Sequence, residues 1–252
     1  MTTAIILAGG LGTRLRSVVS DVPKPMAPIA GKPFLHWQLD YWCQQGIDRF
    51  VLAVGYKHEV ISDYFGTRFQ GRPIVYSVEN SPIGTGGALF QAMNYLLDDG
   101  PFVLLNGDTY FAVSLDALMQ SHQRHQADVT FALFASKEVG RYMGMAVDDH
   151  GRIRALKSGS AEVGALACGG VYVMSPQSLQ LLQSQTFNDL AAAVSLEDEV
   201  FPKALESGYC LQGGYVDGAF IDIGIPNDYH NAHTVIAAAP SQVNKEMDDV
   251  FS

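Results

Sequence analysis

The sequence predicts an α/β protein with a doubly wound, mainly parallel sheet and a smaller β-rich lobe. Short apolar runs alternate along the chain with longer segments of helical apolar spacing, which is the rhythm of βαβ units. The 252 residues are 48% hydrophobic and only 17% charged, so they can bury a substantial core. The apolar runs have few alternating polar positions, which is typical of parallel strands covered on both faces.

The first half of the chain supplies the regular alternation. We predict strands at 3–8, 49–55, 72–78, 101–107 and 128–134. The intervening helices are predicted at 33–46, 58–66, 86–97 and 114–125, several of which end near a glycine.

After Ala135 the rhythm changes to a hairpin over 144–156, with its turn at Asp149-His150-Gly151, and a strand over 169–175. A helix at 196–208 and strands at 209–216 and 219–224 are expected to return to the main sheet. We therefore expect a single domain over 1–236, with a β-rich insert at 136–175, and a C-terminal tail at 237–252.

Charge and cysteine content limit the possible partners. A formal charge of −10 and a pI near 5.0 disfavour binding to nucleic acid or to an anionic membrane surface. The three cysteines are widely spaced and include no C-x-x-C, so neither a disulfide framework nor a zinc site is expected. Without a basic segment before the first apolar run, the cytoplasm is the expected location. A homo-oligomer is left open, because Trp37, Tyr41 and Trp42 could serve a helix-packing face or a subunit contact.

Two histidine pairs, His122 with His125 and His230 with His233, have i, i+3 spacing. No third ligand lies nearby in sequence, so we expect solvated or locally paired side chains here.

A glycine loop follows the first predicted strand, at Gly9, Gly10 and Gly12. The dinucleotide fingerprint fails because Leu15 stands at its third glycine, and the Walker pattern fails because Lys24 is far from the loop. These motifs share backbone N–H groups that approach phosphate oxygens. The loop therefore indicates a phosphorylated ligand, held in another way.

Five segments in order, LAGGLGTRL, PKPMAPIAGKP, IGTGGAL, LNGDTY and FIDIGIPNDY, resemble the sugar-1-phosphate nucleotidylyltransferase family from about residue 5 to 236. The resemblance implies a Rossmann-like fold. It also implies transfer of a nucleoside monophosphate from an NTP to a sugar 1-phosphate, with release of pyrophosphate. Such chemistry depends on positioning and charge neutralisation, because the attacking phosphate is already ionised.

The resemblance also implies roles for particular residues. The nucleotide would lie on the backbone of the glycine loop, with Arg14 on the leaving phosphates and Lys24 between the α-phosphate and the sugar phosphate. With Asp108, these two cations form the expected catalytic set. The expected nucleotide-binding residues are Leu7, Ala8, Gly9, Gly10, Gly12, Thr13, Arg14, Glu79, Gly84 and Thr85.

Asp108 and Asp222 each follow or end a predicted strand. Ligands gather at the strand ends of an open α/β sheet, so two acids distant in sequence can converge there. Mg²⁺ commonly takes one or two protein carboxylates and completes its shell with phosphate oxygens and water. By resemblance, these two aspartates hold Mg²⁺.

Glu79 lies just before IGTGGAL, where family members place the residue that meets the base. An ionised carboxylate only accepts hydrogen bonds, which suits the adjacent N1–H and N2–H₂ donors of guanine. GTP is therefore the favoured nucleotide, and the alternative reading is a solvent-facing acid in a loop.

The sugar side departs from the family pattern. Met143 stands at an expected glycine, Leu156 at an expected acid and Cys168 at an expected asparagine. The remaining sugar-binding candidates are Tyr142, Gly144, Lys157, Gly169 and Glu197. Tyr142 could equally be a core aromatic, and Glu197 a helix N-terminal acid after the cap Ser195.

Within the family, RLRSVVSDVPKPMAPI, SPIGTGGAL and YFG resemble the D-glycero-α-D-manno-heptose 1-phosphate guanylyltransferases, which make a GDP-heptose for bacterial surface polysaccharide. Mannose-1-phosphate guanylyltransferases and amino-sugar-1-phosphate uridylyltransferases are close alternatives. A non-catalytic nucleotide-sugar-binding protein is the alternative of a different class.

Overall fold

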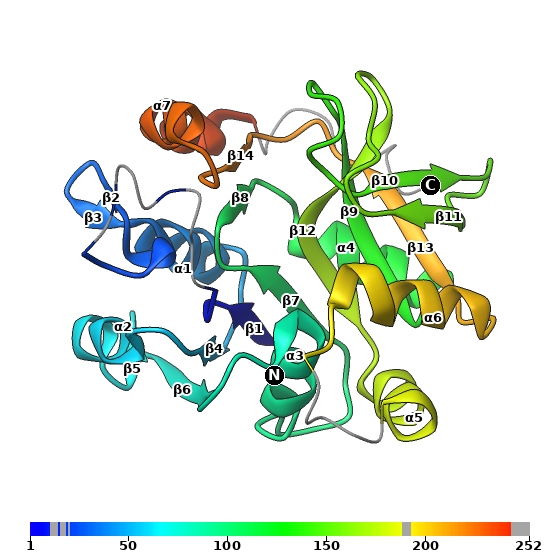
Figure 1. Cartoon of the computed structure of the whole chain (residues 1–252), viewed down its shortest axis with the longest axis horizontal. Coiled ribbons are helices and arrows are strands. Elements are labelled where there is room, and N and C mark those ends of the chain that lie inside the picture. Colours follow the sequence, from blue (N-terminus) through cyan, green and yellow to red (C-terminus); the bar gives the residue numbers. More distant parts are fainter. Residues whose placement is uncertain (11–14, 16–18, 20, 188–192, 243–252) are drawn as a thin grey trace.

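Four parallel strands form the centre of the computed structural model (Figure 1). In spatial order they are β7 (Phe102–Asn106), β1 (Thr3–Leu7), β4 (Arg49–Val54) and β6 (Arg72–Val78). The structure describes residues 1–10, 15, 19, 21–187 and 193–242. Of residues 240–242 it describes only the backbone. The predicted mixed, mainly parallel α/β sheet is confirmed.

The remaining strands extend or flank this centre. They are β2 (Pro28–Ile29), β3 (Lys32–Pro33), β5 (Arg68–Phe69), β8 (Thr109–Phe111), β9 (Val129–Ala135), β10 (Gly144–Val147), β11 (Ile153–Lys157), β12 (Leu166–Met174), β13 (Leu211–Tyr215) and β14 (Phe220–Asp222). The helices are η2 (Lys24–Met26), α1 (Phe34–Gln44), α2 (His58–Phe65), α3 (Gly84–Met93), α4 (Leu115–Arg124), α5 (Pro176–Thr186), η3 (Leu196–Val200), α6 (Phe201–Glu206) and α7 (Pro226–Gln242).

The core lies in two layers, one on each face of the sheet. Ala4 and Ile6 of β1 belong to one buried cluster, which α1, α2, α4 and α7 cover. Ile5 belongs to the opposite cluster, which α3, α5 and α6 cover. Because successive strand residues point to opposite faces, a strand buried on both faces must be apolar throughout. This explains the unbroken apolar runs that predicted the central strands.

The β-rich lobe begins where β12 runs antiparallel to both β7 and β9. β10 and β11 form the predicted hairpin. Its turn is fixed locally: the Asp148 carboxylate accepts from the backbone N–H groups of His150 and Arg152, each at 3.0 Å, and Gly151 has a φ of +73°. β13 returns to the main sheet beside β9, as predicted.

The structure corrects the expected position of the last strand. β14 does not return to the main sheet but pairs antiparallel with β8 in a separate two-stranded sheet. Its Phe220 ring stacks on Phe134 at 4.0 Å between centroids, so the strand is held by aromatic packing above the sheet. α7 runs from Pro226 to Gln242 and so includes the first six residues of the expected C-terminal tail, whose boundary stays a prediction. Residues 243–252 lie outside the described chain.

In the described part of the chain, every helix is too short or too polar to cross a bilayer.

Candidate active site

A cavity of about 910 Å³ opens beside the end of β1. Its wall comes from the first glycine loop, the loop after β4, the segment between β6 and α3, and the turn between β7 and β8. The lining includes Leu7, Gly9, Gly10, Lys24, Gly55, Tyr56, Glu79, Gly84, Thr85, Asn106, Asp108, Glu197 and Gly224. The cavity therefore lies at the carboxyl ends of the parallel strands, where α/β proteins bind ligands.

Most of the expected nucleotide-binding residues that the structure describes line this cavity. Ala8 is the exception, because it is buried behind the lining at 1% exposure. Gly12, Thr13 and Arg14 lie outside the described residues, so their assignment stays a prediction.

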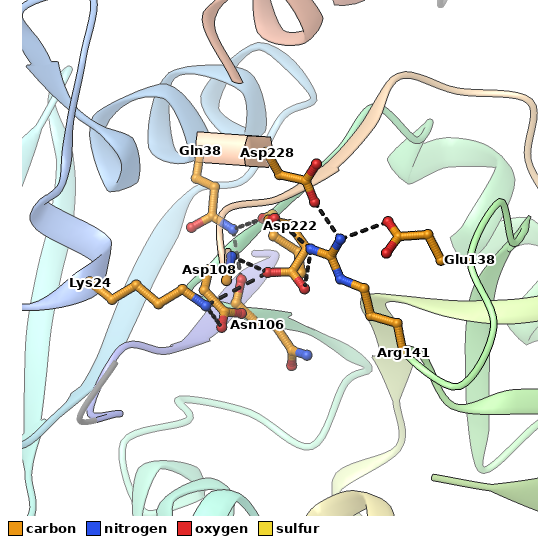
Figure 2. A network of polar contacts seen from close by, with 10 residues as sticks. Lys24, Gln38, Asn106, Asp108, Glu138, Arg141, Asp222 and Asp228 are labelled. Carbon is orange, nitrogen blue, oxygen red and sulfur yellow. Dashed lines mark hydrogen bonds and ion pairs between the residues drawn. The ribbon is translucent and has the colours of Figure 1, made fainter. Parts of the chain in front are cut away.

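Lys24 joins the two predicted metal ligands (Figure 2). Its Nζ lies 2.5 Å from Oδ2 of Asp108 and 3.6 Å from Oδ1 of Asp222. Gly224 leaves the space for this arrangement, because a Cβ there would come within 2.8 Å of Asp222 Oδ1 and 3.2 Å of Lys24 Nζ. The two aspartates therefore converge as expected.

The small sheet of β8 and β14 brings the aspartates together. In its register Asp222 lies opposite Thr109, the residue after Asp108, and the N–H of Ile223 donates to the Asp108 carbonyl at 3.0 Å. Convergence therefore depends on this local pairing as well as on the shared edge of the main sheet.

A buried glutamine holds the turn that carries Asp108. Gln38 of α1, 2% exposed, donates from Nε2 to the carbonyls of Asn106 at 2.8 Å and Thr109 at 2.5 Å. Gly107 at the same turn donates to the Leu7 carbonyl at 3.0 Å. The turn is thus fixed from α1 and from β1, beside the first glycine loop.

Arg141 approaches the aspartates from the β-rich lobe (Figure 2). Its guanidinium pairs with Glu138 at 2.7 Å, with Asp222 at 3.2 Å and with Asp228 of α7. Burial raises the pKa of Asp222 most strongly, and nearby Asp108 raises it further, whereas Lys24 and Arg141 oppose the rise. Lys24 and Arg141 therefore favour the ionised form of the Asp222 carboxylate, which burial and the charge of Asp108 disfavour.

Glu79 lies on the cavity wall against two glycines. A Cβ on Gly55 would come within 2.4 Å of Glu79 Oε1, and one on Gly9 within 2.7 Å. Burial raises the pKa of this carboxyl, while the backbone N–H of Ile83, 3.4 Å from Oε2, lowers it. Glu79 is thus a partly buried acceptor on the cavity wall, and its contact with the base stays a prediction.

The segment at the start of α3 faces both the cavity and a second loop. Gly84 has a φ of +77°, and a Cβ there would meet the Val194 carbonyl at 2.3 Å. Thr85 Oγ1 donates to Glu197 Oε2 at 2.9 Å and accepts from the Leu196 N–H at 2.8 Å. These contacts bring Glu197 to the cavity wall.

Glu197 is an acid in the first turn of a helix and also faces the cavity, and its contact with a sugar stays a prediction. It lies in the first turn after Ser195, whose Oγ accepts from the Asp198 N–H at 3.0 Å as an N-cap. It also lines the cavity, and burial is the main cause of its raised pKa.

The other predicted sugar-binding residues lie outside the cavity lining. Tyr142 packs edge-on against Phe134 and Phe220, at 5.1 and 5.5 Å between centroids. Gly169 is buried, and a Cβ there would meet the Phe111 ring at 2.3 Å. Gly144 starts β10, and Lys157 is exposed at the end of β11. Packing alone accounts for Tyr142 and Gly169, and sugar contact by these four residues stays a prediction.

The donor set of Asp108 and Asp222 fits a hard divalent cation. Their oxygens already share one cationic partner, and Mg²⁺ needs only one or two protein carboxylates. In the described residues no cluster of three or more His, Cys, Asp or Glu side chains offers an all-protein cage. A metal ion here would therefore share its shell with substrate oxygens and would neutralise phosphate charge.

Sequence reasoning missed several polar residues around the site. Gln38 gave no spacing signal, because the carbonyls that it contacts lie 68 and 71 residues away, and the contact of Arg141 with Asp222 spans 81 residues. Asp228 stands in the same FIDIGIPNDY segment as Asp222 and could have been found there.

The fold and the site define a nucleotide-binding α/β protein with an acidic, metal-compatible centre. A family model for nucleotidyl transferases matches residues 3–239, and the chain belongs to this nucleotidyl transferase family. Members of the family generally use a divalent metal ion.

Individual relatives are similar over almost their whole length. The D-glycero-alpha-D-manno-heptose 1-phosphate guanylyltransferase of Aneurinibacillus thermoaerophilus is 43% identical, covering 91% of this chain and 96% of the relative. The protein of the same name from Campylobacter jejuni is 38% identical, covering 90% and 97%. The crystal structure of HddC from Yersinia pseudotuberculosis complexed with GMP-PN has a TM-score of 0.80 and 31% identity, covering 93% of this chain and 99% of that chain.

Proposed function

We propose that the protein transfers GMP from GTP to D-glycero-α-D-manno-heptose 1-phosphate, forming a GDP-heptose and releasing pyrophosphate. A phosphate oxygen of the sugar attacks the α-phosphorus, and the bond from this phosphorus to the bridging oxygen of the β-phosphate breaks. The electron pair leaves with pyrophosphate, and no proton has to be removed from an ionised nucleophile.

The observation that carries the proposal is that Glu79 and the pair of Lys24 and Asp108 line one cavity. The partly buried acceptor Glu79 lies beside Gly9 and Gly55 on its wall, and Lys24 and Asp108 line the same cavity. A guanine base at Glu79 and phosphates near Lys24 fit this arrangement. The similarity to heptose 1-phosphate guanylyltransferases supports the choice of substrates.

The remaining roles follow from the same placement. Gly9 and Gly10 offer backbone close to the phosphates, and Asp108 with Asp222 would hold Mg²⁺. Gly12, Thr13 and Arg14, outside the described residues, would complete the phosphate site. When bound there, Mg²⁺ would supply charge neutralisation at the phosphates. Because GTP and sugar phosphates are cytoplasmic metabolites, we propose that the protein acts in the cytoplasm.

The test is a matrix of nucleotides against sugar phosphates, with pyrophosphate release as the readout. GTP, ITP, UTP, dTTP and CTP are each combined with D-glycero-α-D-manno-heptose 1-phosphate, mannose 1-phosphate and N-acetylglucosamine 1-phosphate in the presence of Mg²⁺. The proposal expects the highest kcat/KM for GTP with the heptose phosphate. Preference for mannose 1-phosphate would support a mannose-1-phosphate guanylyltransferase instead. If no pair released pyrophosphate, the proposed nucleotidyl transfer would be rejected.

A further inference from the structure

Arg141 lies between β9 and β10, and its side chain is 9% exposed although it carries a full charge. Its partners come from three places: Glu138 on its own segment, Asp222 at the end of β14 and Asp228 in the first turn of α7 (Figure 2). A buried guanidinium is tolerated only when its donors are paired. The question is which of these pairs matters for the reaction.

The contact with Asp222 differs from the other two. Nη2 lies 3.2 Å from Oδ2 and also donates to the backbone carbonyl of Asp222 at 3.0 Å. Oδ1 is left to accept from the Gly224 N–H at 2.7 Å and to face Lys24. The two carboxylate oxygens therefore have different partners: Oδ2 contacts Arg141, and Oδ1 faces Lys24.

The orientation of the guanidinium is itself fixed. Its central carbon lies 5.0 Å from the centroid of the Tyr142 ring, and that ring packs against Phe134 and Phe220. Phe220 belongs to the same short strand as Asp222. Arg141 and Asp222 are thus set against each other by one shared aromatic cluster.

We propose that Arg141 is a positioning residue that holds Asp222 with one oxygen directed at the metal and phosphate centre. The inference rests on the proposed function, in which Asp222 binds the metal ion. Outer-shell partners of metal ligands typically contribute ten-fold to 100-fold in metal affinity or activity. A lysine at this position keeps the charge but cannot contact the Asp222 side chain and backbone in the same planar way.

The competing explanation is that Arg141 only ties the lobe to α7 through Asp228 and Glu138. The double variant Glu138→Gln/Asp228→Asn separates the two, because it removes these carboxylate charges and leaves the Arg141–Asp222 contact. The positioning role predicts a lower unfolding temperature for this double variant with metal binding within about two-fold of wild type. Arg141→Lys should instead bind metal about ten-fold more weakly or worse.

Metal binding is measured by Mn²⁺ electron paramagnetic resonance at a saturating level of a non-hydrolysable GTP analogue. Asp222→Asn gives the reference for Mn²⁺ held by the analogue alone, and thermal unfolding without ligands is recorded for every variant. Turnover should show kcat reduced ten-fold to 100-fold in Arg141→Lys, with a raised Mg²⁺ concentration at half-maximal rate.

Unchanged Mn²⁺ affinity in a folded Arg141→Lys protein would overturn the inference. Equal weakening in the Glu138→Gln/Asp228→Asn double variant would overturn it too, because the effect would then follow the lobe contacts. If wild type does not bind the analogue at all, the proposed function fails instead, so the two failures are distinguishable.

Discussion

The Nζ atom of Lys24 lies 2.5 Å from Oδ2 of Asp108, and the same ammonium faces Asp222. A monovalent side-chain cation thus stands between the carboxylates proposed to hold a divalent ion. Because a metal ion and an ammonium would compete for the same oxygens, we expect Lys24 to turn toward the phosphates when metal-bound nucleotide enters.

Replacing Lys24 by Met should therefore affect metal binding and turnover in opposite directions. Without nucleotide, Mn²⁺ should bind about ten-fold more tightly, because a competing positive charge is gone. With substrates, kcat should fall about 100-fold or more, and more than KM rises, because the ammonium acts mainly in the transition state. The matched control is Lys32→Met, since the Lys32 ammonium lies over the Trp37 ring. Weaker Mn²⁺ binding by Lys24→Met would contradict the competition.

Asp108→Asn and Asp222→Asn should each abolish most turnover while the fold persists, because an amide of similar size removes ligand charge. Pyrophosphate release at limiting Mg²⁺ and far-ultraviolet circular dichroism check the two parts. Near-normal activity of either variant would remove that aspartate from the metal site.

Glu79→Gln should erode the preference for GTP over ITP. Guanine offers N1–H and N2–H₂ to a carboxylate, whereas an amide has one acceptor oxygen and directs a donor at a donor. Loss of a charged hydrogen bond, about 1.5–3 kcal/mol, corresponds to roughly ten-fold to over 100-fold in kcat/KM. An unchanged GTP:ITP ratio would mean that Glu79 does not contact the base.

Gly55→Ala should also reduce the preference for GTP over ITP. Its Cβ would lie 2.4 Å from Glu79 Oε1 and would displace the carboxylate. We expect a smaller GTP:ITP ratio, with little further loss when Gly55→Ala is added to Glu79→Gln, since both changes act through one side chain. Additive losses in the double variant would assign Gly55 a separate role.

His122 gives a pH dependence of stability. It is 3% exposed, contacts Thr130 Oγ1 and Ser175 Oγ at 3.0 Å each, and burial lowers its pKa to about 4. An unfolded histidine takes up its proton near pH 6.5, so between about 6.5 and 4 the unfolded state binds more protons and stability falls as the pH falls. The loss should approach about 3 kcal/mol.

Urea unfolding across this pH range checks the His122 prediction, with His122→Gln expected to flatten the curve. The control His150→Gln changes an exposed turn residue and should leave the curve as in wild type. Equal curves for wild type and His122→Gln would place the acid sensitivity elsewhere.

The sequence by itself determined the elements whose causes are local. Apolar runs such as 50–54 predict strands covered on both faces, Gly151 permits the hairpin turn, and Ser195 caps the turn that carries Glu197. The placement of Glu79 and Asp108 after predicted strands brought both to one cavity, because parallel strands end at a common edge.

Tertiary structure alone decided how the acidic centre is held. β14 is three residues long and pairs with β8 across more than a hundred residues, so no periodic pattern could indicate its partner. The contacts of Arg141 with Asp222 and of Gln38 with the Asp108 turn are equally non-local. Such contacts depend on the distance between folded elements, whereas sequence patterns report only which face of its own element each residue occupies.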